Sequence, residues 1–171
     1  WLRDEIQIED IKKHKENKKY LPGVMIPEKL KVMGNIEETI KDKDIILLAI
    51  SSHGIRKVLK ENKDLIKENQ IIVNVAKGIE NESLMRVSQI VKDILPTNKY
   101  VVLSGPSHAE EVAINIPTTV VSSSIDKEAA EYVQDLFMTP KFRVYTNPDV
   151  IGVELGGSFK NVIALAAGIS D

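Results

Sequence analysis

The chain has 171 residues, of which 43% are hydrophobic and 28% are charged, as in an ordinary globular domain. Its 23 basic and 25 acidic side chains give a net charge of -2, so the composition offers no electrostatic footprint for nucleic acid. The absence of cysteine excludes disulfides and thiol catalysis, and it fits a reducing compartment.

Short apolar runs that end at turn-like or small polar residues are predicted to be strands. The first three are nearly continuous in valine, isoleucine and leucine, which is typical of strands covered on both faces of a parallel sheet. The runs cover residues 44–52, 71–78, 100–107, 118–124 and 142–149.

Segments with the helical period lie between these runs. The first is a short stripe of Ile55, Val58 and Leu59, and the second, stopped by Pro96, is formed by Leu84, Val87, Val91 and Ile94. The third follows Asp126 as a predicted N-cap and consists of Ala129, Ala130, Val133, Leu136 and Phe137. This alternation predicts an α/β fold with a twisted, mostly parallel sheet.

Polar clusters follow the first three strand runs, at residues 49–54, 74–80 and 104–111. Because ligands of open α/β sheets bind beyond the carboxyl ends of the strands, we expect these clusters to line one cleft.

Within the second cluster, Lys77 stands between a strand and Gly78, where it could reach an anionic ligand or lie in an exposed loop. In the third, Ser107 and Glu110 form the S-x-x-E pattern of a capping box. The same segment could bind an anion at the start of a helix, with Gly105 allowing close backbone approach.

Two further side chains in these clusters, His53 and His108, could act as acids or bases. A single histidine in a loop is more often incidental, so the pattern favours neither one.

Lys160 lies in a long apolar segment whose helical neighbours are almost all small: Gly156, Gly157, Ala164, Ala167 and Gly168. The two glycines before it each cost a helix about 1 kcal/mol relative to alanine, so close packing by a backbone or a ligand should compensate. A partly desolvated lysine has a lowered pKa and can act as a general acid or base. The alternative is a lysine that extends along the helix to water.

The segment 150–169 is the only one long and apolar enough to suggest a membrane span. It contains Glu154, Lys160 and Asn161, and each charge would be costly in hydrocarbon, so we expect no transmembrane segment.

Several motifs resemble, in order, those of the bacterial-type NAD(P)-dependent glycerol-3-phosphate dehydrogenases. They are NKKYLPG (17–23), AKGIE (76–80), LSGPSHAEEVA (103–113), and FRVYTNPDVIGVELGG (142–157) leading into the signature GVELGGSFKNVIALAAGISD (152–171). The resemblance covers essentially the whole chain. It implies a Rossmann-like, doubly wound dinucleotide-binding domain at 1–149, truncated at its N-terminus, and the first helix of an all-α substrate domain at 150–171.

The resemblance also implies the reaction and the residues that perform it. Members of the family interconvert dihydroxyacetone phosphate and sn-glycerol 3-phosphate with NADH or NADPH, supplying glycerol 3-phosphate for phospholipid synthesis. Lys160 falls on the proton donor or acceptor, and no metal is implied. The implied substrate-binding residues are Lys77, Gly105, Ser107, Lys160 and Asn161, and the implied cofactor-binding residues are Arg3, Lys77 and Ala109.

Arg3 falls beside the adenosine ribose, where an arginine suits the 2′-phosphate of NADP. The neighbouring Asp4 favours NAD, so we expect NADP(H) while NAD(H) stays open. Ser51 replaces the proline that is usual in the family, a change expected to alter the turn near the nicotinamide. The full-length protein is expected to be a cytoplasmic homodimer.

The chain begins at Trp1 and stops at Asp171 after an apolar run, so we expect a piece of a longer protein. The family's glycine-rich turn and the rest of its helical domain are not in the sequence, and these residues alone are expected to lack tight dinucleotide binding and normal turnover. A β-hydroxyacid dehydrogenase-like enzyme is an alternative that the combined SGP and KN motifs disfavour. A non-catalytic binding or assembly module is another, supported by the missing glycine turn.

Overall fold

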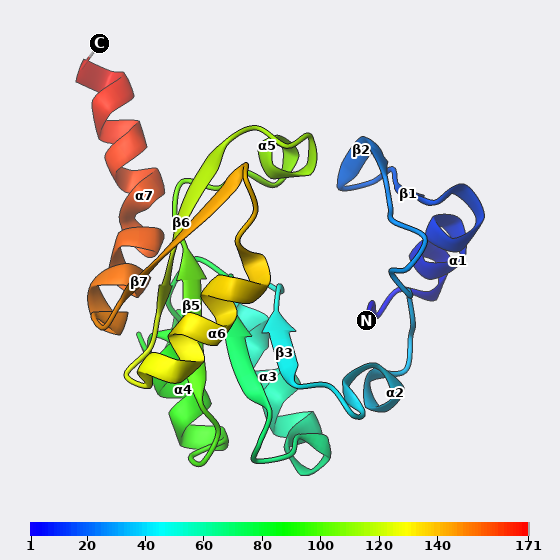
Figure 1. The fold of residues 1–171 in the computed structure, drawn as a ribbon, viewed down its shortest axis with the longest axis horizontal. Helices are drawn as coiled ribbons and strands as arrows, with labels where there is room; N and C mark the ends of the chain where they lie inside the picture. Colours follow the sequence, from blue (N-terminus) through cyan, green and yellow to red (C-terminus); the bar gives the residue numbers. More distant parts are fainter. Residues whose placement is uncertain (171) are drawn as a thin grey trace.

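The computed structural model of the chain describes residues 1–170, apart from the side chain of Asn161 (Figure 1). Its elements are, in order, α1 (Glu5–His14), β1 (Glu16–Asn17), β2 (Leu21–Met25), α2 (Ile36–Ile40), β3 (Ile45–Leu48), α3 (Ser52–Asn62), the 3-10 helix η1 (Lys63–Leu65), β4 (Ile71–Asn74), α4 (Val87–Ile94), β5 (Tyr100–Ser104), α5 (Ala109–Ala113), β6 (Thr118–Ser123), α6 (Lys127–Phe137), β7 (Phe142–Asn147) and α7 (Val150–Ser170).

The central sheet has five strands in the order β3-β4-β5-β6-β7. β3, β4 and β5 are parallel, β6 runs antiparallel to β5, and β7 runs parallel to β6. Each strand lies within one of the five apolar runs, so the prediction of a mostly parallel α/β sheet is confirmed. A separate antiparallel pair, β1 and β2, was not predicted, and it lies with α1 beyond the edge strand β3 (Figure 1).

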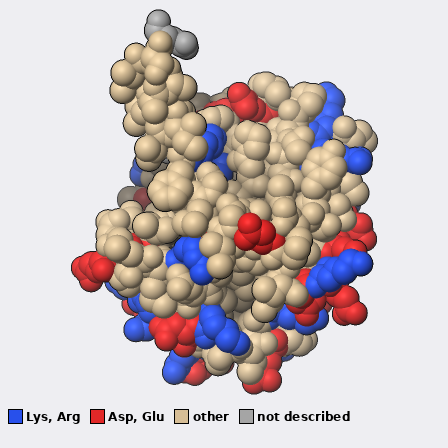
Figure 2. Space-filling model, turned by 90° about the vertical axis from the view of Figure 1, so that its left-hand side faces the viewer, with Lys and Arg blue, Asp and Glu red and all other residues tan. Residues whose placement is uncertain are grey.

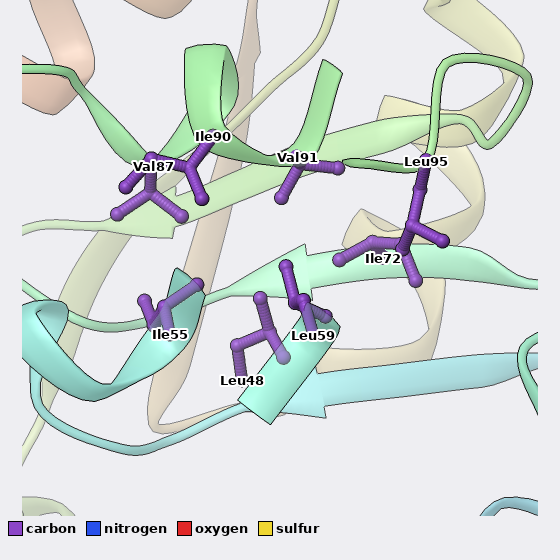
Figure 3. Close-up of a cluster of buried hydrophobic side chains, with 8 residues drawn as sticks. All are labelled: Leu48, Ile55, Leu59, Ile72, Val87, Ile90, Val91 and Leu95. Carbon is purple, nitrogen blue, oxygen red and sulfur yellow. The ribbon is translucent and has the colours of Figure 1, made fainter. Parts of the chain in front are cut away.

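Helices cover both faces of the sheet. On one face, α3 and α4 enclose a buried cluster with β3 and β4 (Figure 3), formed by Leu48, Ile55, Leu59, Ile72, Val87, Ile90, Val91 and Leu95. On the other face, α6 packs over a second cluster of Val73, Val101, Leu103, Val120, Ala129, Val133 and Val144. Because side chains alternate along a strand, Tyr100 and Ser104 of β5 face the α4 side while Val101 and Leu103 face α6.

The sequence predicted the start of α6 correctly but placed the start of α4 too early. The N-cap of α6 is confirmed, since the Asp126 carboxylate accepts a hydrogen bond from the amide of Ala129 at 2.9 Å. The prediction that Leu84 belongs to the stripe of α4 is wrong: it has a left-handed φ of 55° and is 68% exposed. Backbone hydrogen bonds join Glu80 to Leu84 and Met85, closing a turn that directs Leu84 outward.

α7 begins against the sheet and then leaves it. Its first half packs beside β5 and β6, and its second half projects from the body of the molecule (Figure 1) as a segment with an uncharged surface (Figure 2). No single helix within residues 1–170 is long and apolar enough to cross a membrane; the segments Val150–Lys160 and Val162–Ser170, bent by 48°, reach that length and composition only as a pair.

Candidate active site

The three polar clusters lie at the carboxyl ends of β3, β4 and β5, but only the second and third line one cleft, while His53 of the first lines a different hollow. A Cβ added to Gly78, which has a φ of +125°, would lie 2.9 Å from Ser52 Oγ, so the first two loops touch. Lys77 Nζ donates to the carbonyl oxygen of Ser107 at 3.3 Å and lies 3.4 Å from its hydroxyl oxygen. Lys77 therefore points into the cluster and is not a lysine of an exposed loop.

Gly105 is required by close packing of two backbones. A Cβ at this position would lie 2.6 Å from the carbonyl oxygen of Thr119 and 2.9 Å from Cα of Val120 on β6. The amide of Ser107 then donates to the carbonyl oxygen of Gly105 at 2.8 Å, which closes a tight turn. The glycine thus fixes where the Ser107 oxygen atoms meet Lys77.

The predicted capping box at Ser107 is wrong. α5 begins at Ala109 with His108 as its N-cap residue, and no side chain caps its amides. The Ser107 hydroxyl instead lies 3.4 Å from the carbonyl oxygen of Gly105, because the tight turn carries this residue out of the capping position.

α7 delivers Lys160 to the same cluster. A Cβ at Gly157 would lie 2.6 Å from Ser104 Oγ at the end of β5 and 3.8 Å from Lys77 Cγ, so the glycine lets the helix approach the strand. Three residues later, Lys160 is half-buried, with Nζ 3.3 Å from Nε2 of His108. Close packing therefore accounts for Gly157, whereas a Cβ at Gly156 would meet nothing within 4 Å.

The cluster is electropositive. Burial lowers the pKa of Lys77 from its ordinary value, and the nearby charge of Lys160 lowers that pKa further. Within residues 1–170 as described, the Nζ contacts of these two lysines are to Ser107 and His108 and not to a carboxylate. An anion bound between them would relieve their repulsion, so the arrangement suits a phosphate or a developing alkoxide.

An open cleft of about 490 Å³ adjoins this cluster. It is lined by Val75, Lys77, Ser107, Ala109, Val112, Ala113 and Phe142. Lys77, Ser107 and Ala109, which the sequence singled out, therefore share one hollow. Gly105 and Lys160 do not line it, but Gly105 is hydrogen-bonded to Ser107 and Lys160 meets the next residue, His108. The mixture of a cationic group and apolar walls fits a ligand that carries both an anionic and a flat apolar part.

Three other predicted residues lie outside this cluster or its description. Arg3 is exposed in the bend before α1, and α1 lies on the far side of β3 from α7 (Figure 1). Asn161 follows Lys160 in α7, and its side chain is outside the described part of the structure. His53 lies in the first turn of α3 and lines a different hollow with Arg56 and Glu80, so of these two histidines only His108 meets Lys160.

A buried carboxylate that the sequence analysis did not assign anchors α7. Glu154, 7% exposed, accepts from Arg86 Nη1 at 2.7 Å, from Tyr100 Oη at 2.8 Å, and from the amide and hydroxyl of Ser88 at 2.8 and 2.6 Å. It therefore caps the first turn of α4 from another helix. Burial, and then the negative charge of Glu154, raise the pKa of Tyr100 well above its ordinary value, so this phenol stays protonated and donates.

The position of a charged residue, Glu154, inside an apolar run could have indicated that this carboxylate is buried and needs partners. The sequence analysis used Glu154 only as an argument against a membrane span. Lys160 lies six positions after Glu154 in α7, so the network of Glu154 sets the position of the helix that carries this lysine.

A doubly covered, mostly parallel sheet with a cationic cleft at the carboxyl ends of its strands is typical of Rossmann-like domains that bind dinucleotides. The sequence models of two parts of one family match the chain: the NAD-dependent glycerol-3-phosphate dehydrogenase N-terminus over residues 1–130, and the C-terminus of the same enzyme over residues 149–171. The chain belongs to the NAD(P)-dependent glycerol-3-phosphate dehydrogenase family.

Individual relatives are similar over the whole chain. Proteins named glycerol-3-phosphate dehydrogenase (NAD(P)+) from Fusobacterium nucleatum and Clostridium tetani are 52% and 54% identical to it across 100% of its length, which is 52% and 49% of theirs. The crystal structure of glycerol-3-phosphate dehydrogenase from Coxiella burnetii has a TM-score of 0.91 at 33% identity, covering 99% of this chain and 52% of that one. A structure of the Plasmodium falciparum enzyme has a TM-score of 0.90 at 27% identity, covering 98% and 48%. The chain thus spans about half the length of these relatives.

Proposed function

We propose that the full-length protein containing this chain interconverts dihydroxyacetone phosphate and sn-glycerol 3-phosphate with a nicotinamide cofactor. The observation that carries the proposal is the convergence of Lys77 and Lys160 on the consecutive residues Ser107 and His108, with Lys77 and Ser107 lining one open cleft. A phosphorylated ketone offers these lysines a dianion to bind and a carbonyl oxygen to protonate.

In the direction of reduction, Lys160 gives a proton to the alkoxide that develops at the carbonyl oxygen. In oxidation, its neutral amine takes the hydroxyl proton back. Lys77 and the turn at Gly105–Ser107 hold the substrate, and the cleft wall at Lys77 and Ala109 accommodates the cofactor. When bound, the nicotinamide supplies or accepts the hydride.

Arg3 supports a preference for NADP(H). It is exposed in the bend before α1, so its guanidinium is accessible to a 2′-phosphate. Cytoplasmic location and homodimeric assembly, carried over from the family resemblance, complete the proposal.

An activity assay of the full-length protein, which follows the loss of NADPH absorbance, tests the proposed reaction. We expect dihydroxyacetone phosphate to be reduced and small β-keto acids to be inert, with NADPH used more efficiently than NADH. Turnover of β-keto acids without turnover of dihydroxyacetone phosphate would favour the β-hydroxyacid dehydrogenase alternative and overturn the proposal.

Lys77→Met should weaken substrate binding more than turnover. Loss of a charge-assisted contact to phosphate raises the KM for dihydroxyacetone phosphate about tenfold or more. In the unchanged protein, affinity should fall as pH rises through the pKa of Lys77, which lies below its ordinary value, because only the charged form attracts the anion. The matched control is Lys57→Met on the exposed face of α3, which should leave KM unchanged. If Lys77→Met also left KM unchanged, that result would contradict this role for Lys77.

A further inference from the structure

The two lysines are joined by consecutive residues of one loop. The carbonyl oxygen of Ser107 accepts a hydrogen bond from Lys77 Nζ at 3.3 Å. In the next residue, Nε2 of His108 lies 3.3 Å from Lys160 Nζ. His108 is the N-cap residue of α5 and has an extended backbone, with φ -82° and ψ 136°. Its ring is exposed, whereas Lys160 is half-buried.

The chemistry of the contact fixes the form of the ring. An ammonium group only donates hydrogen bonds, so Nε2 must be the acceptor when Lys160 is charged. The neutral ring then carries its proton on Nδ1. The charged groups that face it are Lys160 from α7 and, through Ser107, Lys77 from the end of β4.

We propose that His108 is a positioning residue that holds Lys160 toward the cleft and connects this lysine to the protons of solvent. The inference rests on the proposed function. After Lys160 has given a proton to the substrate alkoxide, it is a neutral amine. An acid in the solvent, hydronium or a buffer acid, gives a proton to Nε2 of His108 and is left as water or as the conjugate base. The ring then passes this Nε2 proton to the amine, which restores the ammonium and leaves a neutral ring. In substrate oxidation the same transfers run in reverse.

The test uses the full-length enzyme with three variants. In His108→Ala, kcat for reduction of dihydroxyacetone phosphate should fall about tenfold, the scale of one hydrogen bond to a charged group, with little change in KM. Added imidazole should restore turnover in a saturable way. His108→Gln keeps an acceptor that can position Lys160 but cannot relay protons, so it should recover only part of the loss and should not respond to imidazole. His53→Ala, at the histidine of α3 that lines a different hollow, should behave like the unchanged enzyme.

A second readout does not depend on turnover. In the ligand-free protein, long-range ¹H–¹⁵N spectra should show His108 Nε2 as an unprotonated nitrogen whose shift changes in Lys160→Ala and stays constant in Lys57→Ala. An unchanged Nε2 shift in Lys160→Ala, or a kcat of His108→Ala within twofold of the unchanged enzyme, would overturn the inference. Failure of the unchanged enzyme to reduce dihydroxyacetone phosphate would instead overturn the proposed function, and the inference with it.

Discussion

Replacing Lys160 by alanine in the full-length enzyme should lower kcat for reduction of dihydroxyacetone phosphate by about 10²- to 10⁴-fold, the usual scale of general acid–base catalysis. Lys160 stands where Gly157 brings α7 against Ser104, and its Nζ lies beside the loop that also receives Lys77. Within the described residues, the side chain that contacts Lys160 Nζ is His108, and Lys77 lies against the neighbouring Ser107. Steady-state rates with NADPH measure the loss.

Two comparisons separate proton transfer from charge. Lys160→Arg keeps the positive charge but cannot give up a proton near neutral pH, so it should hold KM close to the original while kcat stays low. Lys57→Ala on α3 controls for the removal of any lysine. A kcat for Lys160→Ala near that of the unchanged enzyme contradicts the assignment.

Replacing Arg86 by alanine should destabilise the protein by about 3–5 kcal/mol, because it leaves a buried carboxylate without its ionic partner. The Glu154 side chain is 5% exposed and that of Arg86 is 19% exposed, so water cannot readily replace the guanidinium. The hydroxyl groups of Ser88 and Tyr100 would remain, which keeps the loss below that of the whole network. Urea unfolding of the full-length protein measures the effect.

The matched control for this change is Arg143→Ala on β7. Arg143 is exposed and lies over the Tyr145 ring at 5.4 Å, so its removal should cost about 0.5 kcal/mol or less. Equal unfolding free energies for the two variants would show that the Glu154 network does not anchor α7.

The sheet and the meeting of the loops could be predicted because both follow from local pattern. Continuous apolar runs mark strands with two covered faces, and the carboxyl ends of parallel strands must lie at one edge. Lys77 could therefore be placed near residues 104–111 before any coordinates, and Asp126 could be assigned as an N-cap from its position alone.

The errors arose where tertiary contacts override local pattern. S-x-x-E predicts a cap at Ser107, but backbone packing of Gly105 against β6 forces a tight turn and moves the helix start to Ala109. Leu84 fits a helical stripe, but the hydrogen bonds of Glu80 close a turn before α4. The partners of Glu154 lie 54 to 68 residues away in the chain, and spacing within one helix contains no information about them.

The most direct test of the account is the rescue of Lys160→Ala by added amines in the full-length enzyme. If Lys160 supplies the proton, ethylamine should restore reduction of dihydroxyacetone phosphate saturably, and the rate across a series of amines should vary with their pKa. Tetramethylammonium, which carries a charge but no transferable proton, should restore nothing. Equal restoration by tetramethylammonium, or none by any amine in a folded variant that still binds substrate, would contradict the role of Lys160 as the proton donor.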